Sequence, residues 1–250
     1  MPRNLRKKGE FMVSLRRARL APPLAVPAEA VPVIRARPAA LTSVSKRALD
    51  VFFAIILLVL TSPIWLVAAL LIKVTSPGPI LFRQERIGVG GVPFTCYKFR
   101  TMHHGVSDNA HRSLVIQMLT SGERSTDAVD AQPYKINGDH RIIRVGRWMR
   151  RTSLDELPQL INVLRGEMSI VGPRPPLPYE VDRYTEWQME RLTVRPGITG
   201  LWQVSGRNRL TYNEMCALDI QYVRNWSVLT DLRIMVSTPW VMFIDGGGAS

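Results

Sequence analysis

Two adjacent carboxylates, Asp155 and Glu156, precede an apolar-periodic stretch that predicts a helix. Pro158 is tolerated only in a first helical turn, so the sequence places both acids at the helix N-terminus. Two local arrangements are open: Asp155 is the N-cap, or Ser153 and Glu156 form a capping box. Acids in a first turn often do nothing more than cap, and this interpretation stands beside a chemical one.

The chemical interpretation depends on the arginines around this helix start. Arg150 lies about one turn upstream, and Arg174 sits in a rigid Pro-Arg-Pro sequence. Arginine binds phosphate oxygens in pairs, and a helix N-terminus attracts anions. A carboxylate there can hold Mg²⁺ against a diphosphate, or it can attack phosphorus itself, because aspartate is ionised at pH 7 without a base.

Several elements must position these groups. The sequence predicts a β-hairpin over 77–102 with "GVGG" at its turn, an amphipathic helix around 109–119, two helical pieces over 141–165 that end at Gly166, helices near 180–192 and 211–225, a shaped loop "RPGITGLWQVSGRN", and an interfacial helix over 229–244 carrying Trp240.

Residues 51–72 form an uncharged apolar run, "VFFAIILLVLTSPIWLVAALLI", that is long enough to cross a bilayer. Ser62 and Pro63 interrupt its centre, since proline removes a backbone donor and clashes with the preceding turn. The run is therefore either a kinked spanning helix or a helix–break–helix that returns to its own side. Basic residues on both flanks favour two cytoplasmic ends.

The net charge of +13 is concentrated in residues 1–47, which contain eleven basic and two acidic side chains. This Pro-, Ala- and Arg-rich tail either contacts anionic lipid head groups or is a solvated arm. Because the rest of the chain carries only +4 and no base-reading motif, nucleic-acid binding is not expected. Two cysteines, Cys96 and Cys216, provide no disulfide framework or metal-ligand spacing.

Four stretches together resemble the bacterial sugar transferase family, the polyprenyl-phosphate hexose-1-phosphate transferases or monotopic phosphoglycosyl transferases. They are "KRALD" before an apolar run with a Ser-Pro break, "YKFRTM", "RRTSLDELPQLINVLRGEMSIVGPRP" and "VRPGITGLWQVSGRN". The resemblance covers about residues 45–244. It implies a mostly helical α+β fold with three parts: a flexible tail over 1–44 outside the family pattern, a re-entrant membrane helix over 45–76 broken at Ser62-Pro63, and a cytosolic catalytic domain over 77–250 on the membrane surface, with a β-hairpin and interfacial helices.

The resemblance also implies an activity. Such enzymes transfer a hexose-1-phosphate from a UDP-sugar to undecaprenyl phosphate and release UMP, which starts the assembly of exopolysaccharide, capsule or O-antigen. By this match Asp155 attacks the β-phosphorus and forms a phosphosugar-aspartyl intermediate. Asp155 and Glu156 contact Mg²⁺. The expected location is the cytoplasmic face of the bacterial inner membrane.

Arg150 and Arg174 fall where family members carry phosphate-binding arginines. We extend the predicted phosphate-binding set by further basic residues in the motif stretches, for which surface salt bridges are the alternative. These residues are Lys98, Arg100, Arg195 and Arg207.

Two other functions are open at this stage. One is a membrane-anchored interaction protein that keeps the fold without catalysis, and the other is an inverting glycosyltransferase that releases UDP. The sequence identifies neither the sugar nor the polysaccharide, and it leaves a homo-oligomer open.

Overall fold

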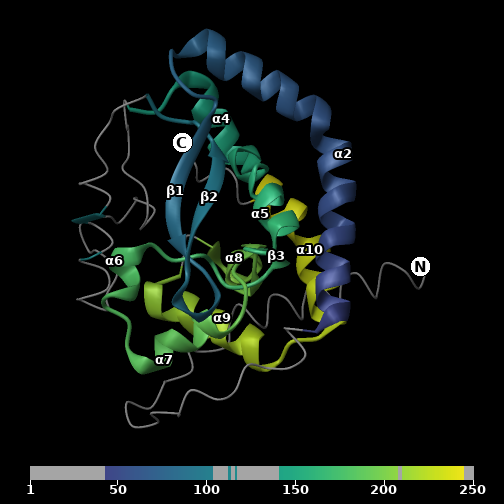
Figure 1. The fold of residues 1–250 in the computed structure, drawn as a ribbon, viewed down its shortest axis with the longest axis vertical. Helices are drawn as coiled ribbons and strands as arrows, with labels where there is room; N and C mark the ends of the chain where they lie inside the picture. Colours follow the sequence, from purple (N-terminus) through teal and green to yellow (C-terminus); the bar gives the residue numbers. More distant parts are fainter. Residues whose placement is uncertain (1–42, 104–111, 114–115, 117–140, 208–209, 245–250) are drawn as a thin grey trace, which may run out of the picture.

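The computed structural model describes residues 43–103, 112–113, 116, 141–207 and 210–244. It is mostly helical, with two small two-stranded sheets, as expected for an α+β fold (Figure 1). The elements, with η for 3₁₀-helices, are α2 (Val44–Thr75), β1 (Leu81–Ile87), η1 (Val89–Gly91), β2 (Pro93–Phe99), α4 (Arg144–Thr152), η2 (Leu154–Glu156), α5 (Gln159–Arg165), β3 (Ser169–Val171), α6 (Pro178–Val181), α7 (Glu186–Met189), η3 (Glu190–Thr193), β4 (Gly197–Thr199), α8 (Leu201–Ser205), α9 (Tyr212–Arg224) and α10 (Val228–Ile244).

The apolar run is one helix of 32 residues, α2, which continues past Pro63 and bends partway along its length (Figure 1). The expected division into two helices is therefore replaced by a bend. Pro63 has no amide to donate to the carbonyl of Val59, four residues earlier. The Ser62 hydroxyl donates to that carbonyl instead, at 2.8 Å. The Ser-Pro pair thus bends the helix and also supplies the missing hydrogen bond.

The first turns of α2 are fixed to the globular part by buried charges, which we call the anchor cluster: Lys46, Asp50, Asp231, Ser169 and Tyr222. The Lys46 ammonium lies 3.0 Å from an Asp50 oxygen and 2.8 Å from an Asp231 oxygen, and these three side chains are at most 6% exposed. The Ser169 hydroxyl donates to Asp50, and the Tyr222 hydroxyl donates to Asp231. The "KRALD" stretch therefore joins α2 to β3, α9 and α10.

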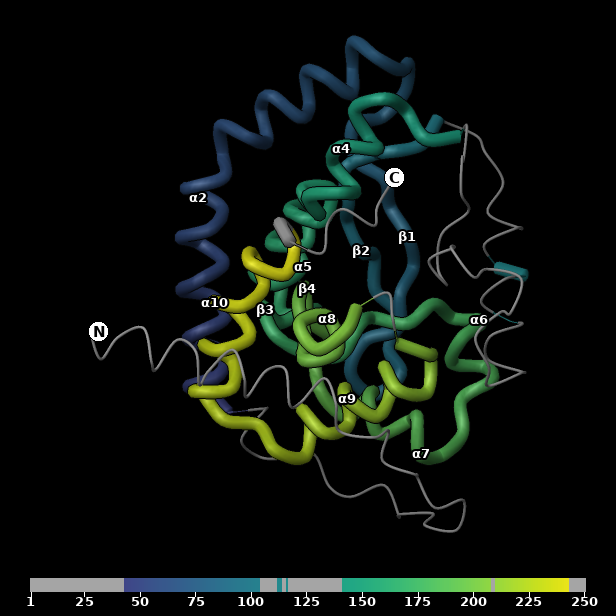
Figure 2. The backbone as a smooth tube through the Cα atoms, turned by 180° about the vertical axis from the view of Figure 1, so that it is seen from behind, coloured from purple at the N-terminus to yellow at the C-terminus, as the bar shows by residue number. Residues whose placement is uncertain are grey.

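The far end of α2 packs against a different part of the same globular body. Ile72 is fully buried in a cluster with Phe99 and Met149. The Trp65 and Phe99 rings meet edge to face, with centroids 5.4 Å apart. Because both ends of the bent helix contact the globular part, α2 curves around it, with α10 beside its first half (Figures 1 and 2).

The outer face of α2 is apolar and exposed. In the described part of the chain, α2 is the one helix long and apolar enough to cross a membrane. At about 1.5 Å per residue it is roughly 48 Å long, more than a bilayer core requires. The exposed large side chains on α2 include Phe52, Ile55, Val59, Leu60, Leu66, Val67, Leu70 and Val74. This exposed apolar surface indicates membrane association.

The predicted β-hairpin is confirmed. Strands β1 and β2 pair antiparallel, from Leu81 opposite Phe99 to Ile87 opposite Pro93. Gly90 and Gly91 have φ angles of 70° and 81° in the turn, a conformation that glycine adopts without steric cost.

A second, parallel pair of strands was not predicted. Strands β3 and β4 have three residues each, and they pair Ser169 with Gly197 and Val171 with Thr199. A Cβ atom on Gly197 would collide with the backbone nitrogen of Gly172, so this close approach requires glycine. The loop "RPGITGLWQVSGRN" therefore contains a strand and the short helix α8, and it lies against the Pro-Arg-Pro segment.

The remaining helices lie where the sequence predicts them, although some predicted helices are divided into shorter ones. The region near 180–192 forms α6, α7 and η3, and the region 211–225 forms α9, where Thr211 and Glu214 make a capping box. Helix α10 exposes Leu229, Val236 and Trp240. The predicted tail over 1–44 and helix around 109–119 lie almost wholly outside the described residues.

Candidate active site

The two carboxylates lie in η2, a single 3₁₀ turn between α4 and α5. Ser153 joins α4 to this turn with a φ of 54°, in the left-handed region, and its side chain makes no capping bond. Neither predicted capping arrangement is present, since α5 begins at Gln159 after Pro158. The carboxylates therefore do not serve as caps of α5.

Asp155 is only 8% exposed, and burial raises its pKa to about 6. The positive charges of Lys98 and Arg150 oppose this rise, whereas the neighbouring Glu156 adds to it. At pH 7 the Asp155 carboxylate is therefore still mostly ionised.

Glu156 is held in its charged form by a direct partner. Burial by itself would raise the pKa of Glu156, but the ammonium of Lys98, 2.6 Å from one carboxylate oxygen, holds this pKa below its ordinary value. Arg207 also favours the ionised form of Glu156. The two adjacent acids thus differ in environment: Asp155 is the less readily ionised of the pair.

A cavity of about 180 Å³ opens beside this turn. Its lining includes four basic side chains and one carboxylate, which gives it an excess of positive charge suited to a diphosphate. These residues are Arg86, Lys98, Arg174, Arg207 and Glu156. The rest of the wall comes mainly from β4, α8 and α10, with Ile198, Trp202, Gln203, Thr238 and Met242 among its residues.

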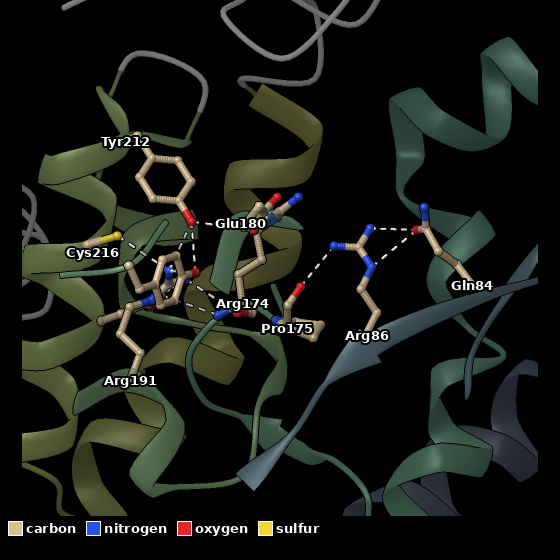
Figure 3. Close-up of polar contacts among 10 residues, drawn as sticks. Gln84, Arg86, Arg174, Pro175, Glu180, Arg191, Tyr212 and Cys216 are labelled. Carbon is tan, nitrogen blue, oxygen red and sulfur yellow. Dashed lines mark hydrogen bonds and ion pairs between the residues drawn. The ribbon is translucent and has the colours of Figure 1, made fainter. Parts of the chain in front are cut away.

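Arg174 is held at the cavity by buried neighbours, and together we call them the Arg174 cluster: Arg174, Glu180, Arg191, Asp219 and Tyr212 (all but Asp219 are labelled in Figure 3). A guanidinium nitrogen of Arg174 donates to both Glu180 oxygens, at 3.1 and 3.2 Å. Arg191 is fully buried and donates from two nitrogens to one Asp219 oxygen, at 2.7 and 3.0 Å. That oxygen also accepts from the backbone amide of Arg174, and the Tyr212 hydroxyl donates to Glu180.

The charged groups of this cluster shift the pKa values of one another. Burial raises the pKa of Asp219 to about 6 against the opposing charge of Arg191. Burial would also raise the pKa of Glu180, but Arg174 and Arg86 outweigh it and hold this pKa below its ordinary value. Arg174, which Glu180 binds directly, and Arg86 therefore keep Glu180 in its charged form.

Arg86 belongs to the site although its sequence context did not identify it. It is buried at the end of β1, and its guanidinium donates to the carbonyl of Pro175 at 2.8 Å and to the side-chain oxygen of Gln84 (Figure 3). Burial and the nearby charge of Arg174 lower the pKa of Arg86. In the sequence, the feature that could have identified Arg86 was its position on the predicted hairpin, two residues after Gln84.

The structure brings most of the predicted site residues together. Lys98, Glu156, Arg174 and Arg207 line the cavity. Asp155 is not part of the lining and is buried in the same turn as Glu156, while Arg150 lies close enough to influence the Asp155 charge and donates to the Thr101 hydroxyl at 2.8 Å.

Two predicted phosphate ligands lie elsewhere. The guanidinium of Arg100 donates to the carbonyl of Ser76 at 2.7 Å and to that of Pro77, where it binds the end of α2. Arg195 donates to the carbonyl of Gly166 at 2.8 Å, after α5. Neither lines the cavity, and each stabilises the end of a helix.

The carboxylates also bear on the predicted Mg²⁺ site. No group of three or more acidic, histidine or cysteine side chains that could hold a metal occurs among the described residues. Mg²⁺ commonly binds one or two carboxylates together with substrate phosphates. Asp155 and Glu156 therefore fit an ion shared with a diphosphate, and they do not form a cage complete in itself.

Comparison with known proteins identifies the family to which the chain is similar. A model of the bacterial sugar transferase family matches residues 41–245. The exopolysaccharide production protein ExoY of Sinorhizobium fredii is 43% identical over 195 residues, which cover 78% of this chain and 84% of ExoY. The UDP-glucose:undecaprenyl-phosphate glucose-1-phosphate transferase of Caulobacter vibrioides is 44% identical, with 77% of this chain and 67% of that protein covered.

A third relative is longer. The undecaprenyl-phosphate galactose phosphotransferase of Salmonella typhimurium is 41% identical over 198 residues, which cover 79% of this chain but 40% of that protein. The chain thus spans less than half the length of this relative.

The chain belongs to the bacterial sugar transferase family. The resemblance recognised from its motifs is confirmed, and so is the prediction that it is an enzyme. The roles of the individual site residues and the magnesium ion stay predictions.

Proposed function

We propose that this enzyme transfers a hexose-1-phosphate from a UDP-sugar to undecaprenyl phosphate and releases UMP, as the priming step of exopolysaccharide, capsule or O-antigen assembly. The observation that carries this proposal is the cavity beside Asp155 and Glu156, whose lining has four basic side chains against one acid. Relatives named for sugar-1-phosphate transfer to undecaprenyl phosphate agree with it.

In the proposed reaction an oxygen of Asp155 forms a bond to the β-phosphorus of the donor. The bond between this phosphorus and the bridging oxygen breaks, and UMP leaves with that oxygen. A phosphate oxygen of the polyprenyl acceptor then attacks the same phosphorus, and the bond to Asp155 breaks. Arg174, Arg207 and Lys98 would bind the phosphate oxygens while their charge develops.

Mg²⁺ bound by Asp155 and Glu156 would neutralise diphosphate charge and favour departure of UMP. Lys98 keeps Glu156 ionised, and its ammonium would share the Glu156 carboxylate with the bound cation. EDTA is expected to stop UMP release, and added Mg²⁺ is expected to restore it.

We also infer that α2 is re-entrant, with both ends on the cytoplasmic face. Its two ends pack against the same globular body, and it bends at the Ser-Pro pair between them. The donor is highly charged and stays in water, whereas the acceptor phosphate lies at the leaflet surface, so a catalyst at this one interface reaches both. Labelling of introduced cysteines at both ends in intact cells, with a membrane-impermeant reagent, tests this topology. An N-terminus that is reachable from outside would refute it.

The experiment that tests the reaction is UMP release by the purified protein with undecaprenyl phosphate and a panel of UDP-sugars. Asp155→Asn is expected to lower the rate at least about 10³-fold, because an amide is not a competent nucleophile. Asp182→Asn, an exposed acid in the same domain, is the matched control and should leave the rate unchanged.

Mass spectrometry of the protein incubated with donor alone should find hexose-1-phosphate on Asp155. Product formation by the Asn variant, or an unmodified Asp155 under conditions that give product, would reject the covalent scheme. Release of UDP in place of UMP would indicate a glycosyltransferase, and no turnover with any donor would favour a non-catalytic role.

A further inference from the structure

Two neighbouring residues of α8 that line the cavity each have one buried polar atom without a hydrogen-bond partner in the described part of the chain. These residues are Trp202 and Gln203. The atoms are the indole nitrogen of Trp202 and the side-chain oxygen of Gln203. Buried polar groups are nearly always hydrogen-bonded, so two unpaired groups on adjacent residues call for a ligand.

Both side chains are held in place by other contacts. Trp202 packs in a cluster with Tyr212, Met215 and Cys216, which fixes its ring. The amide nitrogen of Gln203 donates to the carbonyl of Ile198 at 3.0 Å. This bond determines which end of the amide is the oxygen, and it leaves that oxygen as a free acceptor.

The two unpaired groups differ from the rest of the site in charge. The basic side chains come from the β1–β2 hairpin, the Pro-Arg-Pro segment and Arg207, and they suit phosphate oxygens. Trp202 offers one neutral donor and Gln203 one neutral acceptor. This pair suits a neutral group that can both accept and donate, such as a sugar hydroxyl.

The geometry points to a hexose subsite: we propose that Trp202 and Gln203 bind hydroxyl groups of the transferred hexose and select among sugars. The inference rests on the proposed function. The uracil base also presents an acceptor beside a donor, but ribose and the α-phosphate separate it from the attacked β-phosphorus. The hexose is joined through a single oxygen to that phosphorus, and Glu156, the neighbour of Asp155, lines the same cavity as Trp202 and Gln203.

The test uses Trp202→Phe, which keeps an aromatic ring and removes the donor, and Gln203→Leu, which removes the acceptor. For the 250-residue protein in detergent, kcat/KM for UMP release is measured with UDP-glucose, UDP-galactose and UDP-N-acetylglucosamine. Each variant is expected to lose about tenfold in kcat/KM with the preferred sugar and to discriminate less between epimers. Inhibition by UDP, which lacks a hexose, should stay unchanged.

Matched controls separate this result from a general loss of structure. Trp148→Phe and Gln221→Leu make the same changes at exposed positions outside the cavity, and they should leave the sugar preference as it is. A Tm within about two degrees of wild type shows that each cavity variant is folded. Unaltered sugar discrimination, or a parallel loss of UDP inhibition that assigns the pair to the base, would overturn the proposal.

Failure of the proposed function has a different outcome. If wild-type protein releases no UMP with any donor, the reaction is wrong, and the subsite is then tested by binding alone. In that case isothermal titration of UDP-glucose and UDP-galactose should show a larger loss of affinity than titration of UDP in both cavity variants. Equal losses for UDP and the UDP-sugars would reject the subsite.

Discussion

The protein contains two buried charge clusters, and they differ in how far they are closed. In the anchor cluster the Lys46 ammonium lies between two carboxylates, and all three side chains are at most 6% exposed. Asp50 also accepts from Ser169, and Asp231 from Tyr222. In the Arg174 cluster Glu180 is 1% exposed, whereas the Arg174 side chain is 22% exposed and lines the cavity.

This difference separates a structural ion cluster from a binding one. Charged side chains that are all paired and buried from solvent fix the relative positions of secondary-structure elements, here of α2 against β3, α9 and α10. In a cluster with one charged side chain exposed to a cavity, that side chain is already ordered. A ligand that binds it therefore causes little further loss of side-chain conformational entropy. Variants in the first cluster should therefore change stability, and variants at the open end of the second should change substrate binding.

The largest expected effect is that of Lys46→Met. Removal of the ammonium leaves Asp50 and Asp231 buried without their cation, and a broken buried pair costs about 3–5 kcal/mol. Thermal unfolding in detergent should show a Tm lower by on the order of 10 °C. Lys73→Met is the control, because Lys73 lies exposed at the other end of the same helix. Equal Tm values for the two variants would mean that the anchor cluster does not fix α2.

Arg174→Lys should change substrate binding and leave stability nearly unchanged. Lysine keeps the charge near Glu180 but lacks the planar fork of arginine, so the KM for the donor should rise about tenfold or more with a Tm close to wild type. Steady-state UMP release and thermal unfolding provide the two measurements. Arg151→Lys, at an exposed position on α4, is the matched control. A fall in Tm without a change in KM would place Arg174 in the structural class.

Glu180→Gln tests whether the buried end of the cluster acts through Arg174. The amide keeps an acceptor but loses the charge that orients the guanidinium, so the KM should rise a few-fold. The effect should shrink when Glu180→Gln is introduced into Arg174→Lys, since the two residues are coupled. Additive effects on KM would show that Glu180 influences the site by another route.

The hairpin, the helical character of the apolar run and α9 could be predicted because each has a long local pattern, whereas the continuation of α2 past Pro63 was not predicted. The hairpin has two runs around a glycine turn, and α9 begins at a capping box between Thr211 and Glu214. Strands β3 and β4 could not be predicted, because three residues are too few to show a period. Their pairing depends on the close approach of Gly172 and Gly197, which are distant in the sequence.

The sequence placed some of the residues that line the cavity, but not all of them. Glu156 and Arg174 stand in one dense motif, and the fold brings them to one cavity together with Lys98 and Arg207 from two other motif stretches. Arg100 and Arg195 stand in equally suggestive stretches, yet they bind carbonyl oxygens at helix ends. An arginine can donate to backbone carbonyl oxygens as well as to phosphate oxygens, so the sequence alone does not separate the two uses. Arg86 was missed because its burial arises only when the hairpin packs against the Pro-Arg-Pro segment.

The smallest expected effect on stability concerns single hydrogen bonds at the bend of α2, where one bond replaces a missing one and another is redundant. The Val59 carbonyl lacks its regular donor because of Pro63, and the Ser62 hydroxyl replaces it at 2.8 Å. The Thr61 hydroxyl donates at 2.6 Å to the carbonyl of Leu57, which in a helix already accepts the amide of residue 61.

Ser62→Ala should therefore leave a carbonyl unsatisfied and cost about 1 kcal/mol, a Tm loss of about 2–4 °C. Thr61→Val removes a redundant bond and should change the Tm by less. Thermal unfolding of both variants in the same detergent gives the comparison. Equal losses would mean that Ser62 does not compensate for the proline, and the bend would then depend on the packing of Trp65 and Ile72 at the far end of the helix.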